Sequence, residues 1–241
     1  MSRERPIRDI PRLVVALVAV MLVIQIVWHG TRPAPEATAA ALPTPLPLEQ
    51  LRAVSLGDPV ALAKLLMLWL QAFDNQPGIS IPFKELDYDK VTGWMERILQ
   101  LDPDGQYPLL AASRVYGEVP VEAKQRQMLA FVYDQFLADP NRRWPWLAHA
   151  IYVAKHRLED LPLAYEYARA LREHATGENV PHWARQMELY VLEDMGELES
   201  AKVLIGGLLE SGTITDPHEI WFLTERLKQL EQNDKGSSDD Q

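Results

Sequence analysis

Apolar positions between residues 48 and 230 recur at the three- and four-residue spacing of amphipathic α-helices. Prolines, glycines and Asp-Pro pairs divide this region into segments of helical length, because these residues end helices or occupy their first turn. No segment shows a convincing strand-like alternation, so the predicted fold class is all-α. The predicted helices span residues 48–56, 60–73, 87–101, 106–119, 120–138, 143–158, 161–175, 181–195, 198–210 and 216–230.

Residues 13–28 form a separate apolar run in which Gln25 is the only polar side chain. A helix of this length spans about 24 Å, and Ile10 with Pro11 can extend it toward the roughly 30 Å of a hydrocarbon core. The run therefore predicts a transmembrane signal anchor over residues 13–29. The alternative is a cleaved signal peptide, but the small residues at 37–41 lie too far beyond the run for a well-spaced cleavage site.

Charge is distributed unevenly along the chain. Residues 1–35 carry five arginines against Glu4 and Asp9, a net charge of +3, which leaves −13 for the rest of a chain with a total of −10. Four of these arginines precede the apolar run, so residues 1–12 are predicted to stay in the cytoplasm while the body crosses the inner membrane into the periplasm of a bacterium. The acidic body argues against nucleic-acid binding, which needs clustered lysine and arginine.

Residues 30–47 contain five prolines among alanine and threonine. This composition predicts a semi-extended Pro/Ala-rich linker that holds the body off the bilayer. The helical-repeat domain is then predicted to span residues 48–230, and the polar tail 231–241 is predicted to be disordered.

Two segments at the start of the body do not follow the later repeat. Residues 60–73 are rich in leucine, but they are too short for a second membrane span and are interrupted by Lys64 and Gln71, so a buried helix is predicted. Residues 75–86 contain two prolines and a glycine and are predicted to form a loop whose alternating apolar residues dock on the core. Both a functional and a purely structural role remain open for this loop.

A repeat with a period of 37 residues organises the rest of the body. Asp102–Ala111 and Asp139–Ala148 share five identical residues at this offset, and Trp146, Leu161, Ala164 and Leu171 recur as Trp183, Leu198, Ala201 and Leu208. A fixed period of this size is typical of stacked helical hairpins, since one hairpin cannot bury both of its apolar faces alone. The small side chains of Ala164 and Ala201 are expected to permit close helix approach.

The segments 195–201 and 158–164 resemble the turn between the two helices of a tetratricopeptide repeat, with Pro162 in the first turn of the second helix. The resemblance covers roughly residues 87–230, although the period is longer than that family's usual length of about 34 residues. It implies an α-solenoid of antiparallel helix hairpins.

The wider pattern is similar to an uncharacterised family of bacterial membrane proteins with a tetratricopeptide-like body. The segments that carry this similarity are 58–65, 101–103, 146–150 and 183–187. The similarity implies an architecture and no activity.

In tetratricopeptide arrays the first helix of each pair lines the concave face, so the resemblance implies a partner-binding groove. The residues assigned to it are Trp146, His149, His156, Arg157, Trp183, Gln186, Tyr190 and Glu193, with Leu109 and Tyr116 as weaker candidates. Aromatic and arginine side chains dominate binding energy at many interfaces. For the two tryptophans, packing between helices is the favoured alternative, because large apolar groups at repeated positions usually belong to the core.

Few residues suggest chemistry. There is no cysteine, and the six histidines include no metal-binding spacing: His149 and His156 lie about 10.5 Å apart along a helix, too far for one tetrahedral zinc site. No phosphate-binding loop occurs, and Gly206-Gly207 lies within a predicted helix, where it is expected to mark close packing. We therefore predict no catalytic, cofactor-binding or metal-binding residues and no enzymatic activity.

The function predicted from these features is that of a membrane-anchored, periplasm-facing scaffold that binds other proteins of the cell envelope. One alternative is a structural subunit of an envelope complex, docked through helix 60–73 and loop 75–86. Another is a small-ligand-binding protein with a pocket between that loop and the first repeat.

Overall fold

A computed structural model of the chain describes residues 11–31, 39–212 and 214–238, and most of these are helical. The basic residues 1–10, part of the predicted linker (32–38) and the end of the predicted tail (239–241) lie outside the described residues. The chain divides into two compact units, residues 1–39 with 77–79 and residues 40–76 with 80–241. We refer to the second unit as the body.

Helix α1 (Arg12–Thr31) is the main element of the first unit. It has 20 residues, a mean hydropathy of 2.4 and no buried side chain. A helix of this length extends about 30 Å, which matches a bilayer core. The helix is thus long and apolar enough to span a membrane, as the sequence predicts.

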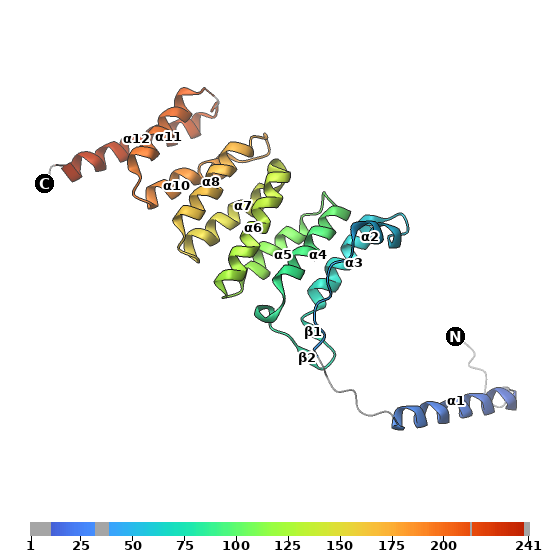
Figure 1. Cartoon of the computed structure of the whole chain (residues 1–241). Helices are drawn as coiled ribbons and strands as arrows, with labels where there is room; N and C mark the ends of the chain where they lie inside the picture. The colour runs from blue at the N-terminus through green and yellow to red at the C-terminus, as the bar shows by residue number, and fades with distance from the viewer. Residues whose placement is uncertain (1–10, 32–38, 213, 239–241) are drawn as a thin grey trace, which may run out of the picture. The chain divides into compact units, whose positions relative to one another are not determined.

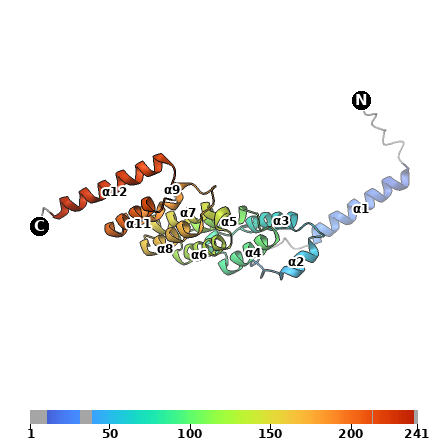
Figure 2. The same ribbon diagram turned by 90° about the horizontal axis from the view of Figure 1, so that it is seen from above.

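The body consists mainly of helices that are named in chain order (Figure 1). They are α2 (Leu48–Val54), α3 (Pro59–Ala72), α4 (Tyr88–Leu101), α5 (Tyr107–Arg114), α6 (Glu122–Ala138), α7 (Pro140–His156), α8 (Leu161–His174), α9 (His182–Arg185), α10 (Met187–Asp194), α11 (Leu198–Glu210) and α12 (Pro217–Ser238). Figure 2 shows the same helices from above. Most packing is between sequence neighbours, and α4 also packs on α6, α5 on α7 and α8 on α10.

Several helix starts follow the capping signals of the sequence. The Asp58 side chain accepts a hydrogen bond from the Ala61 amide at 2.9 Å and begins α3, and Asp160 accepts one from Leu163 at 3.0 Å and begins α8. Pro162 occupies the first turn of α8, and α12 begins at Pro217. These predicted starts are confirmed, because an aspartate cap and a first-turn proline suit the unpaired amides of a helix N-terminus.

Several boundaries differ from the prediction, and three of these differences change an element. The helix predicted over 106–119 ends at Arg114 and continues as the short 3₁₀-helix η3 (Tyr116–Glu118), where a Cβ on Gly117 would lie 2.7 Å from the Ala112 carbonyl oxygen. The helix predicted over 181–195 is divided into α9 and α10. Helix α12 continues to Ser238, into the segment predicted to be disordered.

The loop 75–86 contains elements that the sequence did not predict. Strands β1 (Asn75–Gln76) and β2 (Ile79–Ser80) pair, and the 3₁₀-helix η2 (Phe83–Glu85) follows. Ile81 and Phe83 pack against the core, which confirms the predicted docking of apolar loop residues. The two-residue strands are too short to show the alternation by which strands are recognised.

The core consists of two clusters of buried side chains. The larger extends from Leu42 to Val191, and the smaller joins α10, α11 and α12 through six buried residues. Ala164 and Ala201, the repeated small residues, are fully buried in the larger and smaller cluster, respectively. The expected close packing at Gly206 and Gly207 is wrong, because nothing would lie within 4 Å of an added Cβ at either position.

Helix α3 is not the buried helix that the sequence predicts. Ala63, Met67 and Leu70 are buried, but the side chains of Leu65 and Leu68 are 63% and 61% exposed. Helices α2 and α3 together are also apolar enough to pass as a broken membrane span, with a bend of 108° between them. The reason for the wrong prediction is that α3 packs on α4 and α2 along one side, which leaves its opposite apolar side uncovered.

Residues 40–47, predicted to be part of a free linker, instead pack on the body, and we call them the strap. Gln76 binds both backbone groups of Ala40, at 2.8 and 2.9 Å, and Leu42 is buried. The Trp94 indole donates to the Pro43 carbonyl at 2.9 Å. The predicted spacer 30–47 is therefore too long, because hydrogen bonds and apolar burial fix its second half to the body.

Candidate partner-binding surface

Three of the predicted groove residues, Trp146, His149 and His156, lie on α7, and Arg157 directly follows the last residue of this helix. We call His149, Tyr152, His156 and Arg157 the α7 surface; Trp146 lies one turn before His149. The Tyr152 ring lies between the two histidines, with ring centroids 6.1 Å from His149 and 4.8 Å from His156. The spacing of three and four residues places these side chains on one helix face. Tyr152 is 50% exposed, so a large ring remains open to solvent.

Glu118 of η3 contacts two residues of the α7 surface, His149 and Arg157. Its Oε2 atom lies 2.5 Å from Nη2 of Arg157, and its Oε1 atom lies 3.6 Å from Nε2 of His149. The carboxylate therefore joins the two ends of the surface across α7. Because Arg157 and Glu118 are both partly exposed, this ion pair contributes little stability but restricts the position of the guanidinium group.

His149 is the more buried of the two histidines. Burial is the main cause that lowers its pKa below the ordinary value of 6.5, and the positive charge of Arg114 acts in the same direction. Glu118 and a hydrogen bond with the Ser113 backbone oppose this shift. The His149 imidazole is consequently neutral at pH 7 and adds no positive charge to the α7 surface.

The side chains of two other predicted groove residues, Gln186 and Glu193, contact α12. The Gln186 amide donates to Oε1 of Glu219 at 2.8 Å, and both side chains are buried. Glu193 forms an ion pair with Arg226, whose Nε donates to its Oε1 at 2.8 Å. Gln186 and Glu193 thus bind α12, and Glu219 also contacts Nδ1 of His182 at 2.6 Å.

Tyr190 is partly exposed beside these contacts. It lines a shallow depression of about 240 Å³ together with Trp221, Phe222 and Arg226. Trp221 is 67% exposed. The depression presents aromatic rings beside a guanidinium group, side chains of the kind that contribute strongly at protein interfaces.

The two groove tryptophans occupy different environments. Trp146 is partly buried against the core, and its indole donates to Oε1 of Gln106 at 2.7 Å. Trp183 is 54% exposed and makes an edge contact with Trp144, with ring centroids 5.5 Å apart. Trp146 therefore packs between helices, whereas about half of the Trp183 surface is exposed to solvent.

Sequence reasoning missed Tyr152, Trp221 and Glu118. Tyr152 could have been found, because it follows His149 by three residues on the same helix face. Nothing in the sequence shows that Glu118 reaches α7, since η3 is separated from it by the whole of α6. Trp221 falls at a helical position that is compatible with either a core or an exposed side chain.

Among the described residues, no group of three or more histidine, aspartate or glutamate side chains is placed to hold a metal ion. No protein-family model, curated protein or solved structure matches the chain. The resemblance to tetratricopeptide repeats therefore remains a prediction from sequence.

Proposed function

We propose that the chain is a membrane-anchored scaffold whose body faces the periplasm and binds another protein of the cell envelope. In this proposal α1 is an uncleaved anchor in the inner membrane, and the body is an α-solenoid of antiparallel helix hairpins. The arginines before α1 favour a cytoplasmic N-terminus.

The observation that carries the proposal is the exposed Tyr152 ring between His149 and His156, with Arg157 directly after the end of α7. Exposed aromatic rings and arginine side chains are the groups that most often form binding hot spots. Packing mainly between neighbouring helices supports the solenoid arrangement, in which successive first helices share one face.

Site-specific photo-crosslinking tests the proposal in the intact chain. A photoreactive phenylalanine at Tyr152 is expected to give a discrete adduct with one envelope protein in membranes of the native host. The matched control places the same group at Leu137, an exposed position on α6. Equal labelling at both positions, or none at either, would contradict the α7 surface as the binding site.

The exposed apolar side of α3 favours a second candidate, a structural subunit that docks through this helix. Leu65 and Leu68 are the observation in its favour. A crosslink from Leu65 to a protein of the same complex, with none from Tyr152, would support this candidate over the first.

A further inference from the structure

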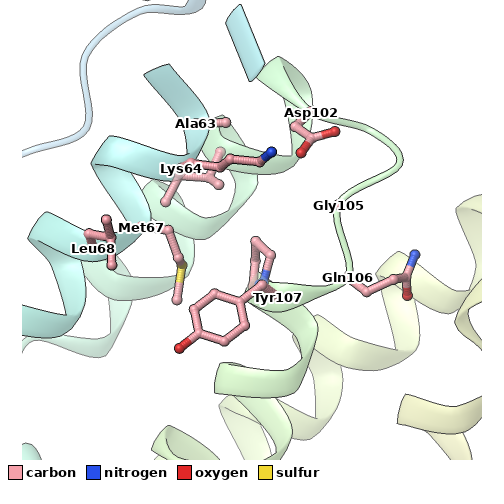
Figure 3. Close-up of a pocket in the computed structure, with 10 residues that line it drawn as sticks. Ala63, Lys64, Met67, Leu68, Asp102, Gly105, Gln106 and Tyr107 are labelled. Carbon is pink, nitrogen blue, oxygen red and sulfur yellow. The ribbon is translucent and has the colours of Figure 1, made fainter. Parts of the chain in front are cut away.

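A cavity of about 390 Å³ lies between α3 and the turn that joins α4 to α5 (Figure 3). Its volume falls within the range of roughly 300–1,000 Å³ that is usual for small-molecule sites. The cavity is separate from the α7 surface. It also differs from the predicted pocket beside loop 75–86, because no residue of that loop lines it.

The walls of the cavity are apolar. Met67 and Leu68 come from α3, Ile98 from α4, and Pro108 with the ring of Tyr107 from α5. Figure 3 shows the Tyr107 ring facing Met67 across the cavity. Such a lining favours a hydrocarbon group, since burial of apolar area contributes about 25 cal/mol per Å².

Hydrogen bonds occupy two of the polar groups near these walls. The Tyr107 hydroxyl accepts a hydrogen bond from Nε2 of Gln71 at 2.9 Å, so Tyr107 offers its ring to the cavity. Gln106 extends away from the cavity in Figure 3, and its Oε1 accepts a hydrogen bond from the Trp146 indole.

One cation and one anion lie at the rim. Lys64 extends from α3 toward Asp102 at the end of α4, as Figure 3 shows. In the part of the chain that the structure describes, neither side chain takes part in an ion pair or a side-chain hydrogen bond. The ammonium and carboxylate groups are therefore both free to bind a ligand that carries the opposite charges.

We propose that this cavity binds an amphiphile with a zwitterionic head, namely a phospholipid whose headgroup ends in an ammonium group. Its acyl chain occupies the apolar cavity, its phosphate pairs with Lys64, and its ammonium pairs with Asp102. A purely anionic amphiphile fits less well, because Asp102 repels a second negative charge at the same rim.

The choice of a membrane lipid rests on the proposed anchor. Nine peptide steps separate Thr31, at the end of α1, from Ala40, where the strap joins the body. A chain of that length extends at most about 30 Å, so an anchored body stays within reach of the bilayer surface. The strap binds α4, which also contributes a wall and one rim charge of the cavity.

Thermal unfolding of the full chain in an uncharged detergent tests the proposal. The probes are a short-chain lysophosphatidylethanolamine and the phosphoglycerol analogue with the same chain. The ethanolamine lipid is expected to raise the Tm saturably, on the order of 5 °C when its concentration is about 100-fold above the dissociation constant. The phosphoglycerol lipid is expected to need an about tenfold higher concentration, because it lacks the ammonium group that pairs with Asp102.

Single substitutions test whether the lipid binds in this cavity. Leu68→Trp fills the mouth of the cavity and should abolish the shift, whereas Leu65→Trp, at an equally exposed position outside the lining, should retain it. Lys64→Gln and Asp102→Asn should each weaken binding of the ethanolamine lipid by about tenfold. These are exposed or partly exposed side chains without internal partners, so the variants are expected to fold.

Two results would overturn the proposal: a lipid shift that persists in Leu68→Trp, or equal shifts from the two lipids. The assay is independent of the anchor, because the lipids are added in detergent. Release of the chain from membranes by alkaline carbonate would instead refute the anchor and, with it, the bilayer as the source of the lipid.

Discussion

At the residue scale, the lowered pKa of His149 makes the free energy of unfolding depend on pH. The folded protein lowers the pKa of this side chain below 6.5, so between the two pKa values the unfolded chain binds more protons than the folded chain. The free energy of unfolding therefore falls as the pH drops through about 6.5, and this contribution levels off below the folded-state pKa.

We expect the His149→Gln variant to lose less stability than the wild type between about pH 7.5 and pH 5.5. Urea unfolding at a series of pH values measures the difference. Identical pH dependence in the two proteins would contradict the assigned environment of His149, whatever the absolute stability of the variant.

Gln186 provides a second prediction at this scale. Replacing it with alanine leaves Glu219 buried without its amide donor, and an unmet buried acceptor costs about 1–3 kcal/mol. Gln186→Ala should lower the free energy of unfolding by that amount, whereas Gln50→Ala, at an exposed position of α2, should change it by less than about 0.5 kcal/mol. If Gln186→Ala instead weakens partner binding and leaves the free energy of unfolding unchanged, Gln186 belongs to the binding groove.

At the scale of the elements, the two copies of the 37-residue repeat use the same residues differently. Asp102 ends α4 and is followed by a turn, so α5 begins only at Tyr107. Asp139 directly precedes α7, which begins at Pro140 and contains Pro145 within the helix. The repeat therefore predicts where helices meet, but not whether a turn separates them.

Glycines inside two helices allow an element-scale prediction. An alanine Cβ at Gly206 or Gly207 of α11 would meet open space, so each substitution should raise the free energy of unfolding by about 1 kcal/mol through helix propensity. An alanine Cβ at Gly93 of α4 would lie 2.8 Å from Cγ of Pro45 in the strap. Gly93→Ala should therefore not raise the free energy of unfolding, and it should make the strap more accessible to proteases.

Chemical denaturation of the three variants, with limited proteolysis of Gly93→Ala, measures these effects. A stabilised Gly93→Ala with an unchanged cleavage pattern would show that the strap does not pack on α4. The strap also shortens the connection between α1 and the body, which restricts the reach of a partner-binding site on an anchored body.

At the scale of the whole molecule, the two core clusters differ in size. Six buried residues join α10, α11 and α12, whereas the larger cluster extends over most of the body. In arrays of neighbouring units, stability is approximately the sum of local terms, so the end with the smaller core opens first. Amides of residues 198–230 should therefore exchange hydrogen faster than those of residues 88–175.

Hydrogen exchange followed by mass spectrometry measures this order. Leu223→Ala, in the smaller cluster, should increase exchange mainly within α10–α12, because its cavity lies in that unit. A uniform increase across the body would indicate a single cooperative unit instead.

The orientation in the membrane is tested on the intact chain. A phosphatase that is active only outside the cytoplasm, fused after Gln241, should be active, because the arginines precede α1. The same enzyme fused after Arg12 serves as the inactive control. An inactive C-terminal fusion that is stably produced would reverse the proposed orientation.

The sequence by itself determined the mostly helical class, the apolar α1 and the starts of α3, α8 and α12. These features depend on local properties, namely apolar periodicity, aspartate caps and first-turn prolines, which act within a few residues. The resemblance to tetratricopeptide repeats assigned His149, His156 and Arg157 to one groove, and this assignment stays a prediction.

Only the tertiary structure decided which apolar and polar side chains are covered. The burial of Gln186 depends on α12, and the contact of Glu118 with α7 depends on how η3 packs. Leu68 is exposed because, among the described residues, no helix packs against that side of α3. The strap and the cavity near Tyr107 likewise arise from segments far apart in sequence. Periodicity identifies the apolar face of a helix, but the partner that covers this face is chosen by packing across the whole fold.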